Sequence, residues 1–348
     1  WSFSSPLVEV LSTLRCFPKG TWGIEIYTPN SALTTLDLRA NADITSINSS
    51  GSADLAMITL NKAALINDLS IGGTMVPIAF ATSIASLRSL DVSDRQLAEI
   101  DLSGLPSLQH LQIQNTQIAH LDFSHNPDLS DLDISNDSAL DRSFLASSSI
   151  HSLRDLGHDY LDLSGMPSSL SSLDIDNSDL SDVTLAGFSN LWHFSCPNCA
   201  ISGINISSNV WLYDLLVADN QLEGIDLRSS SNLYLLDISG NRLTDLYPSN
   251  SPEMAFIKAD CNMLIGVDVT QNTKLYHLEL QDNQLTSIDL TLNADLTELD
   301  LSNNNLTSLN LSAVTQLWSL RVSHNSLTAL DITGNSGLNV LEASHNAL

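Results

Sequence analysis

Basic residues are scarce in this sequence of 348 residues. Lysine and arginine total 13 against 40 aspartate and glutamate residues, which gives a formal net charge of −27 at pH 7. Nucleic acids and anionic membrane surfaces attract proteins through basic patches, so this balance disfavours both as partners. Basic surfaces, divalent cations and neutral glycans stay open.

Signatures of catalysis and of membrane insertion are missing as well. The sequence has no run of 18 apolar residues, no initiator Met and no apolar segment of a signal peptide. Its nine histidines are scattered without an HExxH spacing, and neither GxSxG nor a glycine-rich phosphate loop occurs. We therefore expect no enzyme activity and no direct membrane insertion. Low lysine, high serine and aspartate, and strong acidity favour a secreted or cell-surface protein.

What the sequence has instead is a repeat of fixed length. From Leu170 onward the motif LxxLxLxxNxL restarts every 21 residues, at Leu170, Leu191, Leu212, Leu233, Met254, Leu275, Leu296, Leu317 and Leu338. Less regular starts precede it at Leu33, Leu55, Leu87, Leu108, Leu129 and Ile150. Such a period predicts a solenoid of about fifteen coils, because one unit cannot bury its apolar edge without neighbours.

The repeat divides the chain into a cap and a solenoid. Residues 1–32 lie outside it: Ser5-Pro6 begins an apolar helical stripe, and Trp22 to Tyr27 alternates like a strand that pairs with the first repeat strand. Residues 33–348 form the solenoid. We expect residues 66–86, which contain Gly72-Gly73 and Pro77, to be an inserted loop. Because the sequence stops within a unit, we expect the array to continue or to be capped beyond Leu348.

The unit that starts at Leu296 explains the motif physically, counting that residue as position one. Leu296, Leu299, Leu301 and Leu306 point inward, while the strand Glu298 to Ser302 alternates outward. Position nine is Asn from Asn220 to Asn346, where a short amide satisfies backbone groups of adjacent coils. Earlier units hold other residues there, so we expect the C-terminal half to be the more uniform half.

Four cysteines do not make a disulfide framework. Cys196 and Cys199 form a CxxC motif typical of redox or zinc sites, but the register puts both at inward positions. We interpret them as two small buried core residues, and no second CxxC exists to complete a zinc site. Cys261 falls on an outward position beside Asn262.

The 21-residue unit, with LTSLNLS, LTALDIT and LTSIDLT as second halves, resembles the bacterial leucine-rich-repeat surface proteins of the internalin type. The likeness covers roughly residues 33–348. It implies a leucine-rich-repeat horseshoe or arc with a parallel strand face, and a non-enzymatic recognition or adhesion module on a bacterial surface. Some members place Cys at the inward strand position, as Cys196 does here, but Leu, Ile or Val occupies nearly every other such position in this sequence.

Aromatic residues gather in one column of the repeat. Position two holds Trp192, Tyr213, Tyr234, Ala255, Tyr276, Thr297 and Trp318, and Phe256 follows the gap at Ala255. Stacked strands lie about 4.8 Å apart, so these rings are expected to form a stripe along one margin of the strand face. Such stripes are typical of protein or sugar recognition. The alternative is that the rings are half-buried and merely cover the solenoid edge.

Carboxylates form two further columns. Position five holds Asp37, Asp91, Asp133, Asp174, Asp237, Glu279, Asp300 and Glu342, and position fifteen holds Asp101, Asp122, Asp162, Asp226, Asp268, Asp289 and Asp331. We assign Asp174, Asp237, Glu279 and Asp300 to the candidate ligand-binding surface beside the aromatic column. No metal site or cofactor is expected: one carboxylate per coil supplies too few oxygens for calcium, and bonds to local backbone are favoured over calcium.

Two functions therefore compete. The first is extracellular recognition or adhesion, in which the strand face holds a protein or glycan partner. The second is structural, in which units assemble into a surface filament or layer through an open strand edge. A third option is an intracellular scaffold or a secreted effector.

Overall fold

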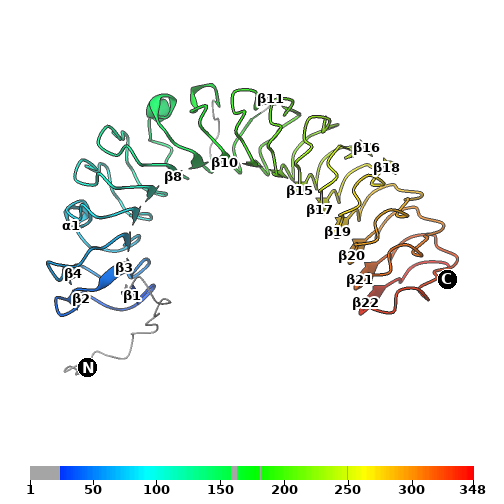
Figure 1. The fold of residues 1–348 in the computed structure, drawn as a ribbon, viewed down its shortest axis with the longest axis horizontal. Helices are drawn as coiled ribbons and strands as arrows, with labels where there is room; N and C mark the ends of the chain where they lie inside the picture. Colours follow the sequence, from blue (N-terminus) through cyan, green and yellow to red (C-terminus); the bar gives the residue numbers. More distant parts are fainter. Residues whose placement is uncertain (1–23, 158–162, 181, 249) are drawn as a thin grey trace. The chain divides into compact units, whose positions relative to one another are not determined.

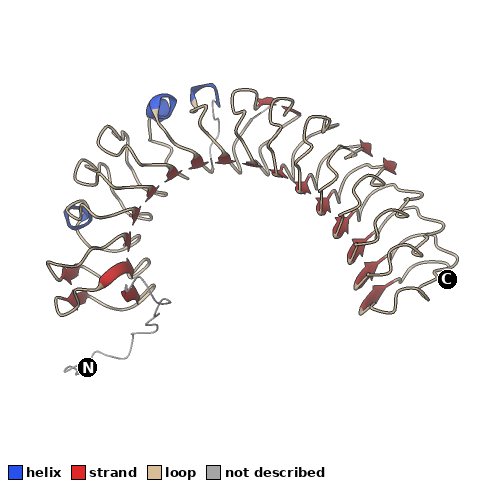
Figure 2. Cartoon of the chain, viewed as in Figure 1, coloured by secondary structure: helices blue, strands red, loops and turns tan. Residues whose placement is uncertain are grey.

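The computed structural model describes residues 24–157, 163–180, 182–248 and 250–348 (Figure 1). The chain divides into two compact units: the first holds residues 1–155 and 165–167, and the second holds residues 156–164 and 168–348. The cap helix expected from Ser5-Pro6 lies outside the described residues. In each unit successive coils stack with their strands along one side and their turns on the other (Figure 2).

The first unit is built on a parallel sheet in the order β1-β3-β5-β6-β7-β8-β9. Each strand pairs in register with the strand of the next coil. The strands are β1 (Ile24–Tyr27), β3 (Ile44–Asn48), β5 (Asp68–Ser70), β6 (Ser89–Asp91), β7 (His110–Gln112), β8 (Asp131–Asp133) and β9 (Ser152–Arg154).

The second unit repeats this arrangement with greater regularity, in the order β10-β12-β14-β15-β17-β19-β20-β21-β22. Its strands are β10 (Ser172–Asp174), β12 (His193–Ser195), β14 (Asp214–Leu216), β15 (Leu235–Asp237), β17 (Phe256–Lys258), β19 (His277–Glu279), β20 (Glu298–Asp300), β21 (Ser319–Arg321) and β22 (Val340–Glu342). The predicted solenoid of about fifteen coils with 21-residue spacing and a parallel strand face is therefore confirmed.

Short elements decorate the other sides of the coils. Three parallel strand pairs lie off the main sheet: β2 (Thr35–Leu38) with β4 (Met57–Leu60), β11 (Asp182–Thr184) with β13 (Gly203–Asn205), and β16 (Asp245–Leu246) with β18 (Gly266–Val267). The helical turns are α1 (Ile78–Ala81), η2 (Arg142–Ser147) and η3 (Leu163–Gly165).

A left-handed residue at position eight marks the register of every coil. The φ angle there is positive, from 53° at Asp219 and Cys261 to 79° at Gly157. Asn, Asp and Gly fill most of these positions because they tolerate this conformation best. From the coil of β3 onward the set is Gly51, Gly73, Asp94, Asn115, Asn136, Gly157, Asn177, Asn198, Asp219, Gly240, Cys261, Asp282, Asn303, His324 and His345.

This marker corrects the register that we expected near the N-terminus. Residues 66–86 are a regular coil, not an inserted loop: β5 pairs with β3 and β6, and Gly73 is simply position eight. The first coils therefore start at Ile44 and Ile66, which are fully buried. Strand β1 forms as expected but pairs with β3, because the strands after Leu33 and Leu55 are β2 and β4, off the main sheet. Asp37 consequently leaves the position-five column.

Position nine links neighbouring coils in the second unit. The Asn241 side-chain amide donates to the carbonyls of Val217, Ile238 and Ser239, and its oxygen accepts the N–H of Leu222. Thus one side chain bonds its own coil and the preceding one, which confirms the predicted role of this asparagine. The same bonds recur at Asn220, Asn262, Asn283, Asn304, Asn325 and Asn346.

The corrected register shows how the first unit meets the same demand with other residues. Ser52, fully buried at position nine, accepts the N–H of Ser31 and donates to the carbonyl of Thr28. Thr74 donates to the Ile71 carbonyl. Each hydroxyl makes fewer bonds than an amide does, so these coils are joined by fewer side-chain bonds.

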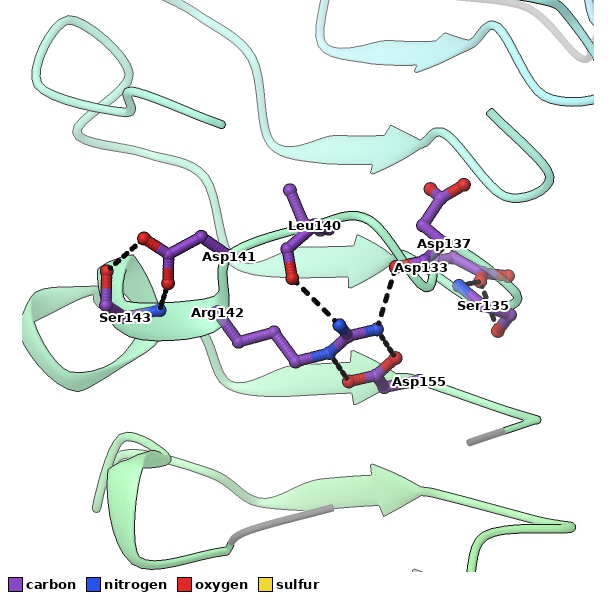
Figure 3. A network of polar contacts seen from close by, with 8 residues as sticks. All are labelled: Asp133, Ser135, Asp137, Leu140, Asp141, Arg142, Ser143 and Asp155. Carbon is purple, nitrogen blue, oxygen red and sulfur yellow. Dashed lines mark hydrogen bonds and ion pairs between the residues drawn. The ribbon is translucent and has the colours of Figure 1, made fainter. Parts of the chain in front are cut away.

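An acidic residue at position nine requires a separate source of donors (Figure 3). Asp137 accepts the Thr116 N–H at 2.6 Å but, when ionised, has no hydrogen to donate. Arg142, from η2, supplies donors to the carbonyls of Asp137 and Leu140 and also binds Asp155 with two bonds of 2.6 and 2.8 Å. Asp155 occupies the inward position six and is fully buried. Burial raises the pKa of Asp137 to about 6.

A second asparagine ladder, which we did not anticipate, lies at position nineteen on the turn side. The Asn272 amide donates to the carbonyls of Pro248 and Ser251 of the preceding coil. Equivalent bonds are made by Asn126, Asn209 and Asn293. The recurrence of Asn at 21-residue spacing was the available sequence signal.

Cys196 and Cys199 are fully buried, as predicted, but they are not two separate core residues. A disulfide joins them. Cys261 is exposed, in agreement with its expected outward position.

Candidate binding surface

The aromatic stripe, defined here as Trp192, Tyr213, Tyr234, Phe256, Tyr276 and Trp318, lies in the second unit. The rings of Tyr213 and Tyr234 stack in parallel with centroids 4.8 Å apart, which is the spacing of adjacent strands. Phe256 then contacts Tyr234 at 5.5 Å and Tyr276 at 6.0 Å, so it fills the gap left by Ala255. Four of the six rings therefore form one continuous row across four coils.

Exposure along the stripe is uneven. Trp192, Tyr213, Tyr276 and Trp318 expose 40 to 50% of their surface, whereas Tyr234 and Phe256 are half-buried and Ala255 is buried. Tyr213, Tyr234, Phe256 and Tyr276 each pack against a neighbouring ring, and Trp192 and Trp318 are exposed. The stripe thus combines both expected features: it covers the margin of the sheet and presents apolar surface to solvent.

Histidines on the strand face are clamped between carboxylates. In β12, His193 Nε2 lies 2.9 Å from Asp174 and Nδ1 lies 3.2 Å from Asp214, which belong to the preceding and following coils. In β19, His277 Nε2 lies 2.6 Å from Glu279 and Nδ1 lies 3.1 Å from Glu298. The hydrogen bond to Asp174, more than that to Asp214, raises the pKa of His193.

These histidine–carboxylate contacts were not predicted from the sequence, although the sequence contains the spacing that produces them. A histidine at position three has a position-three carboxylate in the next coil and a position-five carboxylate nearby. His110 in the first unit follows part of this rule, since its Nδ1 lies 3.0 Å from Asp131.

The other two predicted carboxylates bond to local backbone. Asp237 accepts the N–H and the hydroxyl of Ser239, and Asp300 accepts the N–H of Ser302. Both are half-buried on the strand face. Lys258 Nζ lies 4.0 Å from Glu279 Oε2, and Arg321 Nε lies 3.2 Å from Glu342 Oε1. The four predicted carboxylates therefore share the strand face with the stripe, but they do not converge on one point.

The position-fifteen column bonds to local backbone, as the favoured interpretation expected. Asp268 and Asp289 each accept the N–H of the residue two places on, and the hydroxyls of Thr270 and Thr291 together with these N–H groups lower the pKa of the two carboxyls. Asp162 lies outside the described residues. Among the residues that the structure describes, no three His, Cys, Asp or Glu side chains are grouped so as to hold a metal ion.

One hollow of about 280 Å³ lies in the first unit, on the turn side. Phe123 and Phe144 line it, with ring centroids 5.1 Å apart in an edge-to-face arrangement. None of the predicted binding residues contributes to it.

Comparison with known proteins agrees with the coil geometry. The family model for the leucine-rich repeat matches residues 295–317. No curated protein matches the chain by sequence. Within the described ranges, no helix is both long enough and apolar enough to cross a bilayer.

Three solved structures illustrate the likeness. A leucine-rich-repeat protein of Leptospira interrogans is 18% identical, with a TM-score of 0.71, over 92% of this chain and 90% of that one. The functional domain of InlJ from Listeria monocytogenes, described as including a cysteine ladder, is 23% identical with a TM-score of 0.55, over 90% and 68%. The ectodomain of the Arabidopsis thaliana receptor kinase GASSHO1/SCHENGEN3, in complex with CASPARIAN STRIP INTEGRITY FACTOR 2, is 21% identical with a TM-score of 0.64, over 93% and 46%.

At these identities the likeness shows the fold alone. The chain therefore has the leucine-rich-repeat fold, and bacterial internalin-type proteins are among the structures that share this fold.

Proposed function

We propose that the second unit is an extracellular recognition module that holds a protein or glycan partner on its strand face. The observation that carries this proposal is the aromatic stripe. Aromatic rings supply large contact area at low entropic cost, and binding hot spots are enriched in Trp and Tyr. Four of these rings are exposed although the solenoid interior is filled by leucine. The receptor ectodomain of similar fold, solved with its partner, supports such a use of the scaffold.

The non-enzymatic role and the location, which complete the proposal, have separate support. A non-enzymatic role fits a strand face whose histidines and carboxylates bond to one another rather than surrounding a substrate-sized cavity. A secreted or cell-surface location fits the scarcity of lysine, the acidity and the internalin-type likeness.

The test is a binding screen against secreted and matrix proteins and neutral glycans. For each ligand found, affinity is compared between the wild type and the variant Tyr213→Ala/Tyr234→Ala/Tyr276→Ala. We expect the variant to lose binding while its urea unfolding stays close to that of the wild type. The matched control is Trp211→Ala/Tyr247→Ala, which removes two exposed rings outside the stripe.

Unchanged affinity in the triple variant, or an equal loss in the control, would refute the stripe as the binding surface. Light scattering of the wild type over a concentration series adds an independent check. If the particles grow into long assemblies as the concentration rises, the protein has the structural role instead of the recognition role.

A further inference from the structure

The chemistry of the partner can be narrowed, on the basis of the proposed recognition function. We infer that the strand face of the second unit takes a cationic segment of a protein, rich in arginine or lysine, rather than a neutral glycan. The inference rests on which charges stand beside the stripe.

Carboxylates outnumber cations on the strand face itself. Positions three and five of the second unit carry seven carboxylates, and the cations at those positions are Lys258 and Arg321. The seven are Asp174, Asp214, Asp237, Glu279, Glu298, Asp300 and Glu342. Position eight adds Asp219 and Asp282, both exposed, on the margin opposite the stripe. A ligand on this face therefore meets aromatic rings along one margin and negative charge across the rest.

Hydrogen bonds hold four of these carboxylates in fixed orientations on the strand face. Asp237 and Asp300 are oriented by the N–H groups of Ser239 and Ser302. Asp174 and Asp214 are oriented by His193. Even when protonated, the imidazole carries one positive charge against two carboxylates, so the cluster stays negative.

Aromatic faces and fixed carboxylates together suit a guanidinium or ammonium group. A cation placed over the face of Tyr or Trp is attracted by the ring, and a carboxylate beyond the ring adds a charge-assisted hydrogen bond. Arginine uses both contacts at once because its planar group stacks and donates in a fork. A neutral sugar stacks on the rings and can donate hydroxyls to the carboxylates, but it does not compensate their negative charge.

The test measures binding of an Arg-Gly repeat peptide, a Glu-Gly repeat peptide and a neutral maltooligosaccharide, by fluorescence titration at low and high salt. We expect only the Arg-Gly peptide to bind, with affinity that falls as salt rises. The variant Asp237→Asn/Asp300→Asn should bind it about tenfold more weakly, because two face charges are gone.

The control for net charge is Asp268→Asn/Asp289→Asn. These two aspartates also accept the N–H two residues on, but they lie at position fifteen, outside the strand face, so the charge change is the same and only the place differs. Asn keeps that bond, as Asn205 and Asn310 do at the same position. We expect less than about a twofold change in this control.

Equal weakening in the two charge variants would overturn the inference, since binding would then follow the overall charge of −27. Arg-Gly binding that survives Tyr213→Ala/Tyr234→Ala would overturn it too. If the maltooligosaccharide binds through the stripe and the Arg-Gly peptide does not, the cationic partner is wrong while the proposed recognition function stands. Failure of the Arg-Gly peptide to bind at low salt would also reject the cationic partner.

Discussion

The two units answer the same structural demand at position nine in different ways. From Asn220 onward the second unit repeats one asparagine, whose amide bonds its own coil and the preceding coil in the same way each time. The first unit uses Ser52, Thr74, Arg95, Thr116 and Asp137, and each of them makes its own set of bonds. Where the residue is Asp137, which cannot donate when ionised, the guanidinium of Arg142 supplies the donors. The fold thus requires polar groups inside each turn, but it does not require one residue type.

The largest test of this comparison is Arg142→Met in the first unit. Removing the guanidinium takes away both bonds of the ion pair to the fully buried Asp155 carboxylate, which costs about 3 to 5 kcal/mol of unfolding free energy at pH 7. Hydrogen exchange of the first unit should detect the loss. A loss below about 1 kcal/mol would show that the pair adds little to this unit.

The matching test in the second unit is Asn262→Ala. The substitution removes bonds to the carbonyls of Ile238, Ala259 and Asp260 and to the N–H of Leu243, all inside the turn. Leaving these groups unpaired should cost about 3 kcal/mol. The comparison is Thr116→Ala in the first unit, for which about 1 kcal/mol is expected. Urea unfolding followed by hydrogen exchange measures both, and equal losses would contradict the difference between the units.

A smaller effect is expected when a position-nine residue of the first unit is replaced by the residue that the second unit uses there. Asp137→Asn restores the residue type of the second unit and neutralises a desolvated carboxyl. Because burial raises the pKa of Asp137 to about 6, above its ordinary 3.8, the folded state binds more protons than the unfolded state between these values. The contribution of this group to stability is therefore present at low pH and is lost as the pH rises through about 6.

The variant should accordingly gain about 2 kcal/mol over the wild type at pH 7 and little at pH 4. Thermal unfolding of the two proteins at both pH values measures the difference. A gain of the same size at pH 4 would assign the effect to packing instead of ionisation.

Much of the fold was readable from the repeat because a coil must close on itself after a fixed number of residues. The inward leucines, the position-nine asparagines and the aromatic column followed from that period alone. Residues 66–86 were misassigned because Gly72-Gly73 resembles a loop signal, whereas Gly73 is the left-handed position of a regular coil. In a less regular array, the glycine or asparagine at position eight is a safer guide than the leucines.

The polar details were not predictable in the same way. Asp155 sits at an inward apolar position, so its sequence context suggests a broken repeat until Arg142 is seen beside it. The His193 and His277 clamps depend on side chains from adjacent coils, which meet only once the strands are stacked. The disulfide between Cys196 and Cys199 was not predicted, because it depends on the two side chains meeting within one turn.

The position-nine ladder also sets the size of permitted changes in chain length. Each asparagine reaches only its own coil and the one before it, and the groups that it meets there are backbone groups present in every coil. Deleting or duplicating a whole 21-residue coil in the second unit therefore gives every remaining asparagine an equivalent set of partners. A deletion of 20 residues whose ends fall between positions one and nine would move the left-handed residue and the asparagine out of step with the leucines. The array can lengthen or shorten by genetic duplication and loss, but only in whole coils.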